Sequence, residues 1–188
     1  MTLSLARLGL MGGSVDSGSL EFISELTMDG SASSYSITSI QESEYEVHFL
    51  QANDVRIPSV NGDRMKFRVI TSAGVVSSNS YSYMSQQNSP AGHNESKVDG
   101  TNNLPFIKNT GTVANSTANG TMYVYQAGNS SLRCTVNYMS TAVEQNSRYN
   151  SWFGGGVYNA ESVVTGFNFF SSGNITGRIR LYGVKSWV

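Results

Sequence analysis

The stretch that decides the fold is residues 167–188, FNFFSSGNITGRIRLYGVKSWV. It begins with apolar residues at alternate positions, Phe167 and Phe169, and continues through Ser-Gly-Asn, which favours a turn. After the turn, Ile179 and Leu181 alternate with two arginines and a tyrosine, and this period of two is typical of a half-buried β-strand. The pattern predicts a β-hairpin whose second strand closes a sheet.

The same period recurs along the chain and predicts an all-β fold. Alternating segments are separated by short Gly, Asn and Ser clusters, and no window sustains the i, i+3, i+4, i+7 spacing of an amphipathic helix. Such a series of short strands favours a single antiparallel β-sandwich, jelly-roll-like, with a small barrel as the alternative. Strands are expected near residues 20–28, 34–40, 45–49, 64–69, 104–107, 122–126, 132–138 and 163–170.

Strand pairing is expected to be local. The strand at 34–40 is predicted to form a hairpin with the strand at 20–28. In the next strand the predicted core face is Tyr45, Val47 and Phe49, which places His48 and its acidic neighbours in solvent. The basic face of the strand at 64–69 would then pair with that acidic face across the two strands.

Two segments show no alternation and are predicted to be irregular. The first, residues 86–103, is expected to form a long exposed loop, and such loops are often functional. The second is residues 140–156, which carry Trp152 and the glycine run at 154–156.

The length of 188 residues fits one domain with a sizeable core. We assign residues 14–188 to the β-sandwich and treat residues 1–13 as an N-terminal arm or an extra first strand. The segment carries five large apolar residues ahead of Gly-Gly, and these are the predicted interface or anchoring residues: Leu3, Leu5, Leu8, Leu10 and Met11. Strand addition to another chain is the preferred mode of anchoring.

Composition argues against several kinds of partner. Charged residues make up 13% of the chain and the net charge is −1, so no basic surface is predicted for nucleic acid or for an anionic membrane. We find neither a signal peptide nor a run of the ~20 apolar residues that a membrane-spanning helix needs, and synthesis in a cytoplasm is expected. The single cysteine, Cys134, is predicted to be a buried inert thiol, with an interchain disulfide as the alternative.

No set of residues predicts catalysis, a cofactor or a metal. His48 is expected on a solvated strand face, and His93 has no second histidine or cysteine at metal-ligand spacing. A Gly-x-Ser-x-Gly elbow is absent from the sequence, and the glycine run at 154–156 lacks the Lys-Ser/Thr of a phosphate loop. The chain is therefore predicted not to be an enzyme, although a carboxylate pair that meets only in the fold would leave polysaccharide cleavage as an alternative.

Aromatic side chains are the abundant specialised resource. Three of them fall in or next to the second irregular segment and are the candidates for stacking on a glycan or for contacting a protein: Tyr149, Trp152 and Tyr158. A carbohydrate-binding module is accordingly the main alternative to a structural protein.

The closing sequence GRIRLYGVKS resembles the Gly-x-Ile-x-Leu-Tyr-Gly ending of virion structural proteins of tailed bacteriophages, particularly marine ones. The resemblance extends upstream over the strand and serine-rich stretch at residues 19–40, the YEVHFL segment at 45–50 and the GDRMKFR segment at 62–68. It covers most of the chain, although each motif is short, and the N-terminal segment contains no recognised attachment motif.

The resemblance implies a β-sandwich displayed on a phage particle, made in the host cytoplasm and built into the virion. Such relatives are non-enzymatic, are often homotrimers and attach through an N-terminal segment. The function expected on this basis is capsid decoration or a head-fibre role, with the major capsid or tail proteins of the same virion as partners. The alternative within the same resemblance is a tail fibre or receptor-binding tip that binds host surface carbohydrate.

Overall fold

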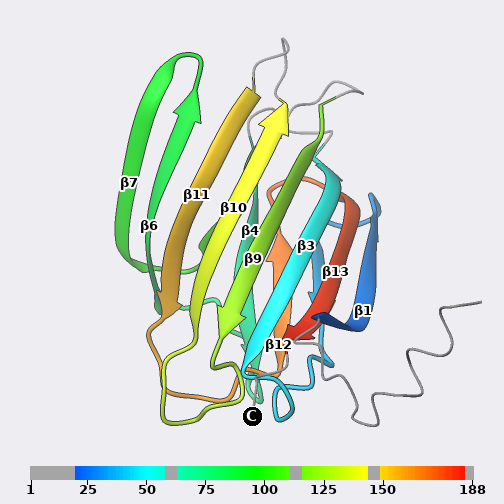
Figure 1. Cartoon of the computed structure of the whole chain (residues 1–188), viewed down its shortest axis with the longest axis vertical. Coiled ribbons are helices and arrows are strands. Elements are labelled where there is room, and N and C mark those ends of the chain that lie inside the picture. The colour runs from blue at the N-terminus through cyan, green and yellow to red at the C-terminus, as the bar shows by residue number, and fades with distance from the viewer. Residues whose placement is uncertain (1–19, 58–62, 111–115, 144–148, 185–188) are drawn as a thin grey trace, which may run out of the picture.

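The computed structural model describes residues 20–57, 63–110, 116–143 and 149–184, and every regular element in these ranges is a β-strand. The strands form two antiparallel sheets that face each other (Figure 1). The large sheet contains β1 (Leu20–Asp29), β3 (Val47–Arg56), β6 (Tyr81–Ser89), β7 (Gly92–Thr101), β9 (Ala118–Tyr125), β10 (Thr135–Val143), β11 (Tyr149–Tyr158) and β13 (Thr176–Val184). The small sheet contains β2 (Ser34–Ile37), β4 (Asp63–Thr71), β5 (Gly74–Val75), β8 (Leu104–Thr110) and β12 (Gly166–Phe170).

The strand order is that of a jelly roll. Strands from the first half of the chain pair with strands from the second half in reverse order, as β1 with β13, β2 with β12, β3 with β9 and β4 with β8. This nesting gives one four-stranded layer β1-β13-β3-β9 and a second layer β2-β12-β4-β8. The predicted jelly-roll-like sandwich is therefore confirmed.

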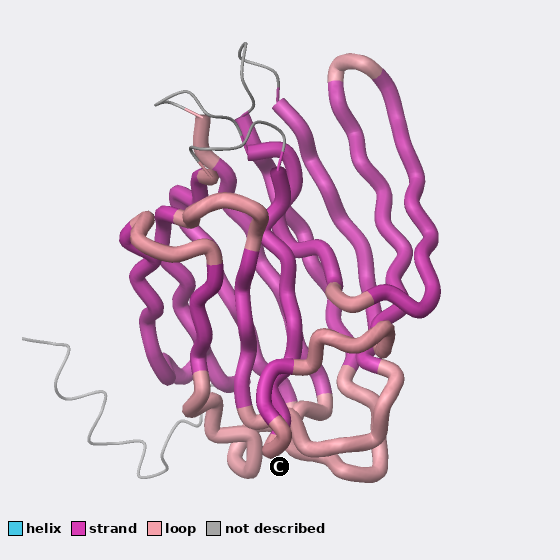
Figure 2. Tube along the Cα trace, turned by 180° about the vertical axis from the view of Figure 1, so that it is seen from behind, coloured by secondary structure: helices cyan, strands magenta, loops and turns pink. Residues whose placement is uncertain are grey.

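Two insertions widen one layer. The β10–β11 hairpin lies between β9 and β12 in the chain, and the β6–β7 hairpin follows the short β5. Both hairpins add to the β9 edge, which extends the large sheet in the order β9-β10-β11-β6-β7. Viewed from behind, the β6–β7 hairpin stands beside the small sheet rather than under it (Figure 2).

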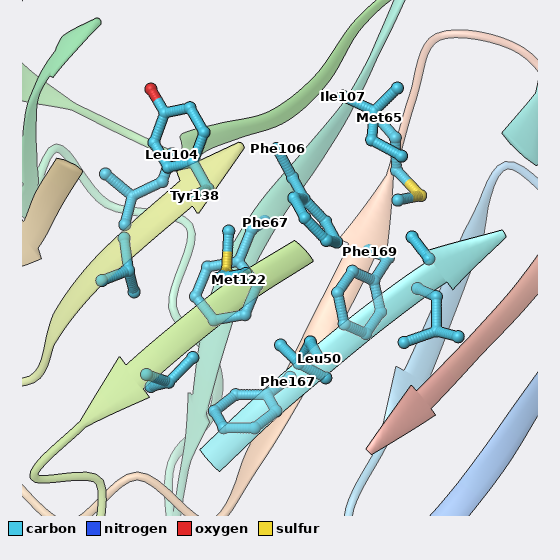
Figure 3. Close-up of a cluster of buried hydrophobic side chains, with 14 of the residues drawn as sticks. Leu50, Met65, Phe67, Leu104, Phe106, Ile107, Met122, Tyr138, Phe167 and Phe169 are labelled. Carbon is cyan, nitrogen blue, oxygen red and sulfur yellow. The ribbon is translucent and has the colours of Figure 1, made fainter. Parts of the chain in front are cut away.

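The core fills the space between the two layers. The small sheet contributes fully buried rings, with the centroids of Phe67 and Phe167 5.4 Å apart and those of Phe67 and Phe169 5.9 Å apart. The large sheet supplies aliphatic partners such as Leu50 and Met122, which Figure 3 shows against these rings. Interleaving of aromatic and aliphatic side chains from two sheets is the normal way in which a sandwich buries its inner faces.

The closing strand β13 has the predicted faces but not the predicted partner. Ile179 and Leu181 are fully buried, whereas the arginines between and before them point outward. However, β13 lies between β1 and β3 in the large sheet, while β12 pairs with β2 and β4 in the small sheet. The Ser-Gly-Asn turn therefore carries the chain from one sheet to the other, and the predicted hairpin is wrong.

Two glycines of the closing strand have steric reasons to be glycine. Gly177 has φ +131°, where a side chain is strained, and it approaches the backbone of Val55 closely. Gly183 lies under the buried ring of Tyr45, which occupies the space that a Cβ would need. The ring is held there by a hydrogen bond of 2.6 Å that the Tyr45 hydroxyl donates to Glu21.

Two other predicted pairings are also wrong. The strand β2 pairs with β12, so it does not form a hairpin with β1 in the other sheet. The strands β3 and β4 likewise lie in opposite sheets, so the expected charge pairs between their acidic and basic faces do not form. The basic face of β4 instead meets aromatic rings, with the Arg68 guanidinium 3.9 Å from the ring centroid of Phe170.

The inner face of β3 is the opposite of the predicted one. His48, Leu50 and Ala52 are buried, whereas Val47 and Phe49 lie on the outer face. A shift of one residue exchanges the two faces of a strand completely. Tyr45 is buried as predicted, but it precedes the strand.

Both segments predicted to be irregular contain strands. Residues 86–103 form part of β6 and all of β7, and Gly92, the first residue of β7 after the turn, has φ +127°. Residues 140–156 include the end of β10 and most of β11, so Trp152 and the glycine run lie within a strand. The predicted arm or first strand, residues 1–13, lies outside the described residues.

Candidate binding surface

The outer face of the large sheet carries a row of aromatic rings. Phe22 of β1, Tyr182 of β13, Phe49 of β3 and Tyr123 of β9 are direct cross-strand partners in sequence across four strands. Successive ring centroids are 5.8, 6.0 and 4.9 Å apart, and Tyr125, two residues further along β9, lies 6.3 Å from Tyr123. We call these five residues the aromatic patch.

Aliphatic residues flank the aromatic patch on one side. Leu20, Val184, Val47 and Tyr125 form a second cross-strand row on the same outer face. Phe22 is 60% exposed and Leu20 is 46% exposed, so the described residues leave both side chains largely open to solvent. Contiguous exposed apolar surface of this kind marks a place where something binds.

A charged row borders the aromatic patch on its other side. The Arg180 Nε donates a 2.7 Å hydrogen bond to Glu25 Oε2 on the neighbouring strand, and this contact raises the pKa of the arginine. Gln51 and Thr121 continue this row across β3 and β9. The outer face thus changes from apolar to polar along the strands.

A second apolar group lies on the inserted strands. Met139 of β10 and Phe153 of β11 are cross-strand partners, and Met84 of β6 is the partner of Gly155. The three side chains are all exposed, Met84 at 63%. We call Met84, Met139 and Phe153 the methionine patch.

The methionine patch is flanked by two shallow hollows. One, of about 410 Å³, is lined by Met84, Lys97 and Asp99 among others, and the other, of about 490 Å³, by Met84, Glu95 and Phe153 among others. Each hollow thus combines an apolar floor with charged residues of β7. A partner side chain inserted beside Met84 would find both apolar contact and a charge.

The glycine run of β11 explains why the hollows exist. Gly154 and Gly156 point inward, where an added Cβ would lie 2.7 Å from the Tyr138 hydroxyl and 2.6 Å from a Leu104 methyl carbon. Gly155 points outward and leaves the sheet bare between Asn137 and Met84. The glycine run therefore allows close packing on the inner face of the sheet and leaves a depression on its outer face, where Gly155 has no side chain.

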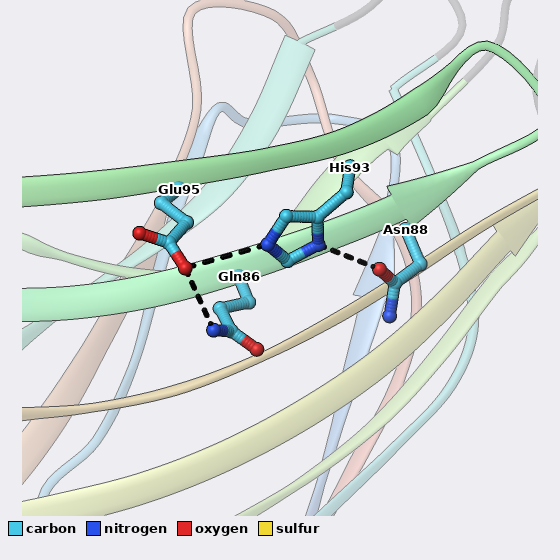
Figure 4. A network of polar contacts seen from close by, with 4 residues as sticks. All are labelled: Gln86, Asn88, His93 and Glu95. Carbon is cyan, nitrogen blue, oxygen red and sulfur yellow. Dashed lines mark hydrogen bonds and ion pairs between the residues drawn. The ribbon is translucent and has the colours of Figure 1, made fainter.

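Figure 4 shows how polar contacts fix the β6–β7 hairpin. Glu95 accepts a 3.0 Å hydrogen bond from the Gln86 amide, and its oxygen lies 3.4 Å from His93 Nε2. The other ring nitrogen of His93 is 2.9 Å from Asn88 Oδ1. His93 is thus an exposed member of a hairpin network.

His48 is buried, contrary to the prediction of a solvated face residue. Its Nε2 donates a 2.8 Å hydrogen bond to the Ile40 carbonyl, and its ring lies edge-on to Tyr45 and Phe167. Burial lowers the pKa of the imidazole, and Nδ1 finds no hydrogen-bond partner among the described groups. These contacts are those of a neutral core histidine.

The structure separates the three aromatic candidates. Tyr149 is 63% exposed on the outer face at the start of β11, opposite Val143. Trp152 and Tyr158 are 2% and 6% exposed, because they point inward from the same strand, and neither offers a ring for stacking on a ligand. The sequence analysis predicts an irregular segment here, and without a strand it could not predict which of the three side chains point outward.

Trp152 has a structural role at the seam between the sheets. Lys108 of β8 lies 4.7 Å and Arg64 of β4 5.8 Å from the indole centroid, and Tyr138 packs on it edge-on. Lys108 also donates a 2.6 Å hydrogen bond to Gln87 of β6. These contacts tie the inserted strands to the small sheet.

The other predicted sites are placed as follows. Leu3, Leu5, Leu8, Leu10 and Met11 lie outside the described residues. Cys134 is buried as predicted, and burial raises the pKa of its thiol to about 12. Among the described residues no group of three histidine, cysteine or acidic side chains is placed to hold a metal ion.

Comparison with known proteins adds little to this surface. No family model matches the chain, and no curated protein matches it. Among solved structures, the CBM2 module of Lactobacillus casei BL23 phage J-1 evolved Dit is similar over 82% of this chain and 70% of that chain, with 10% sequence identity and a TM-score of 0.25. A TM-score this low establishes neither a common fold nor a common function.

A search of the described residues for a helix with the length and hydropathy of a transmembrane segment finds none.

Proposed function

We propose that this chain is a non-enzymatic structural protein of a tailed bacteriophage virion, which self-associates and decorates the capsid by protein–protein contact. The closing sequence at residues 177–186 supports the assignment to a virion by its resemblance to phage structural proteins. The jelly-roll strand order is compatible with it, because this fold is common in viral capsid proteins as well as in lectins.

The observation that carries the binding role is the methionine patch with its two hollows. Methionine side chains are flexible and polarizable, and they are used on surfaces that adapt to a protein partner. Here two methionines and a phenylalanine are exposed together on a sheet whose other face is packed. Charged side chains at the rim of each hollow would orient the partner, as at the polar rim of a protein interface.

The proposed partners are further copies of this chain, as a homotrimer, and the major capsid or tail proteins of the same particle. The apolar residues Leu3, Leu5, Leu8, Leu10 and Met11 are the proposed anchor on the particle. The proposed site of action is the virion, after synthesis in the host cytoplasm.

The test uses a charge-introducing double variant, Met84→Glu with Met139→Glu, in the full chain. Mass photometry of the wild type should give three times the 20.3 kDa chain mass, and the double variant should be monomeric. Particles that lack the protein should take up the wild type but not the variant, as scored by cryo-EM. Thr27→Glu, at an exposed position on the outer face of β1, is the matched control.

Unchanged oligomeric mass together with unchanged uptake by the double variant would overturn the role of the methionine patch. Localisation of the wild-type chain away from intact virions by immunogold labelling would overturn the virion assignment.

A second candidate function is binding of host surface carbohydrate, as in a tail fibre or receptor-binding tip. The observation in its favour is the exposed ring of Tyr149, the one member of the predicted stacking set that reaches solvent. A glycan array would show saturable binding that is lost in Tyr149→Ala and kept in Trp152→Phe. Absence of binding across host polysaccharides would remove this candidate.

A further inference from the structure

The aromatic patch is an apolar face for which the described residues provide no cover. It lies on the jelly-roll layer β1-β13-β3-β9, whereas the methionine patch lies on the inserted strands that continue the same sheet beyond β9. Phe22 at its outer end is 60% exposed and Tyr123 is 40% exposed. A segment that covers this patch needs an apolar face, and that face has to extend across the four strands β1, β13, β3 and β9.

The chain itself leads to this patch. Leu20, the first described residue, is the register partner of Val184, and both belong to the aliphatic row beside the aromatic rings. Nineteen residues precede Leu20 in the sequence. The N-terminal segment is therefore attached at the corner of the apolar surface.

The sequence of that segment suits an apolar platform. Residues 3–11, LSLARLGLM, contain five large apolar residues and a single charge, that of Arg7. Residues 12–19, GGSVDSGS, are small or polar except for Val15, and they join the leucines to β1. Leucine and methionine side chains laid on phenylalanine and tyrosine rings would remove apolar surface of both from water.

The linker is long enough for the segment to reach the patch of its own chain. Eight extended residues span up to about 26 Å, at ~3.3 Å per residue. The distance from β1 to β9 across four strands is about 14 Å, at ~4.8 Å per strand spacing. Every ring of the patch is thus within reach of the leucines.

The short linker also favours the same chain over a neighbour. A tether of eight residues holds the segment at an effective concentration of the order of millimolar. At micromolar protein, a second copy competes at about a thousandfold disadvantage. From these observations we propose that residues 3–11 lie on the aromatic patch of their own chain.

This proposal goes beyond the virion role and does not depend on it. The cover involves the aromatic patch, whereas self-association was assigned to the methionine patch on other strands. The covering leucines are also the proposed anchor on the particle, so the particle is the partner that would compete for them. A consequence is that the leucines are held against the large sheet until a partner competes for them.

The test is paramagnetic relaxation enhancement by NMR on the full chain. A nitroxide is attached at position 4 in Ser4→Cys, since the native Cys134 is buried and its thiol is protonated. The expected result is loss of amide signal intensity in β1, β13, β3 and β9 around the aromatic patch, with the β6–β7 hairpin unaffected. The matched control adds Leu5→Ser and Leu8→Ser to the labelled chain and should restore the intensities.

An experiment with mixed chains distinguishes a segment of the same chain from a segment of a second copy. When labelled chain without ¹⁵N is mixed with unlabelled ¹⁵N chain, signal loss in the ¹⁵N chain would show a segment from a second copy and would overturn the proposal. Equal signal loss in the serine control, or none around the patch in either protein, would overturn it as well. So would saturable glycan binding by the full chain that is lost in Tyr123→Ala, because the patch would then be open.

A second measurement covers the case in which the label disturbs docking. Deletion of residues 1–13 should raise the fluorescence of an apolar-surface dye several-fold, and Phe22→Ser in the deleted chain should lower it again. Equal dye fluorescence of the full and deleted chains would contradict the proposal.

Discussion

Substitution of Gly183 by alanine tests the packing of the closing strand. The added Cβ would lie 2.5 Å from Cδ2 of the Tyr45 ring and closer still to Cγ and Cδ1. Because Cγ is the ring atom nearest the backbone, rotation of the ring about its own axis cannot relieve the clash. Tyr45 has to leave its site, which breaks the hydrogen bond that its hydroxyl donates to Glu21.

The cost follows from the burial of that ring. Tyr45 is 4% exposed, and an aromatic side chain of this kind buries roughly 150–250 Å². At about 25 cal/mol per Å² this is worth ~4–6 kcal/mol, so exposure of half the ring costs about 2–3 kcal/mol. This matches the usual cost of overpacking a core, about 1–3 kcal/mol. For a domain of this size the Tm should fall by about 5–10 °C.

The assay is thermal unfolding by circular dichroism in a double-mutant cycle. Gly183→Ala should destabilise the wild type by the stated amount but should have little effect in a Tyr45→Ala background, because the clash is then gone. Gly177→Ala is the matched control, since its cost comes from a positive φ and from the nearby Val55 backbone and should not depend on Tyr45. An unchanged Tm for Gly183→Ala, or an equal loss in both backgrounds, would refute this account of the strand.

Three further outcomes follow from buried side chains. Burial lowers the pKa of His48 below its ordinary value of 6.5, so the unfolded state takes up a proton first. The free energy of unfolding should therefore fall as pH drops from 7.5 through 6.5 to 5.5, and His48→Gln should flatten this dependence in urea titrations; an equal slope would contradict it. Trp152→Ala should cost about 3–5 kcal/mol of unfolding free energy, measured by chemical denaturation, because the indole fills the seam between the sheets, and a near-wild-type midpoint would argue against that role. The Cys134 thiol, whose pKa burial raises to about 12, should resist a disulfide reagent at pH 8 until denaturant is added, and rapid labelling of the native chain would be inconsistent with its burial.

Strands with one apolar and one polar face were predictable from the sequence. In β4, Met65, Phe67 and Val69 alternate with basic residues and all three are buried as expected. In β13, Ile179 and Leu181 likewise face the core. Alternation has a single meaning in β4 because only one face is apolar, and in β13 because Arg178 and Arg180 mark the outer face.

The prediction failed where the outer face is itself apolar. In β3, Val47 and Phe49 point outward, so alternation of apolar residues predicts a core position for them and a surface position for His48, the reverse of the structure. The aromatic patch was missed for the same reason, since its rings come together only through cross-strand register between distant segments. In β7, both faces are polar, and the strand left no periodic signal.

Pairing partners were not predictable from local sequence. Turn signals such as Asp29-Gly30 suggested hairpins, and the backbone does turn there, with Gly30 at φ +86°. In a jelly roll, however, these turns lead from one sheet to the other. The true partners of β1 and β2 are β13 and β12, more than a hundred residues away.

The nested pairing has a consequence for biosynthesis. Strand β13 is an internal strand of the large sheet, between β1 and β3, yet it is the last of the described strands to leave the ribosome. Until residues 176–184 have emerged, β1 has no partner among the described strands of its sheet, and β3 is paired with β9 alone among them. The jelly-roll layer therefore closes only after these residues are made, and nascent chains that stop before residue 176 would expose two long strand edges to other nascent chains.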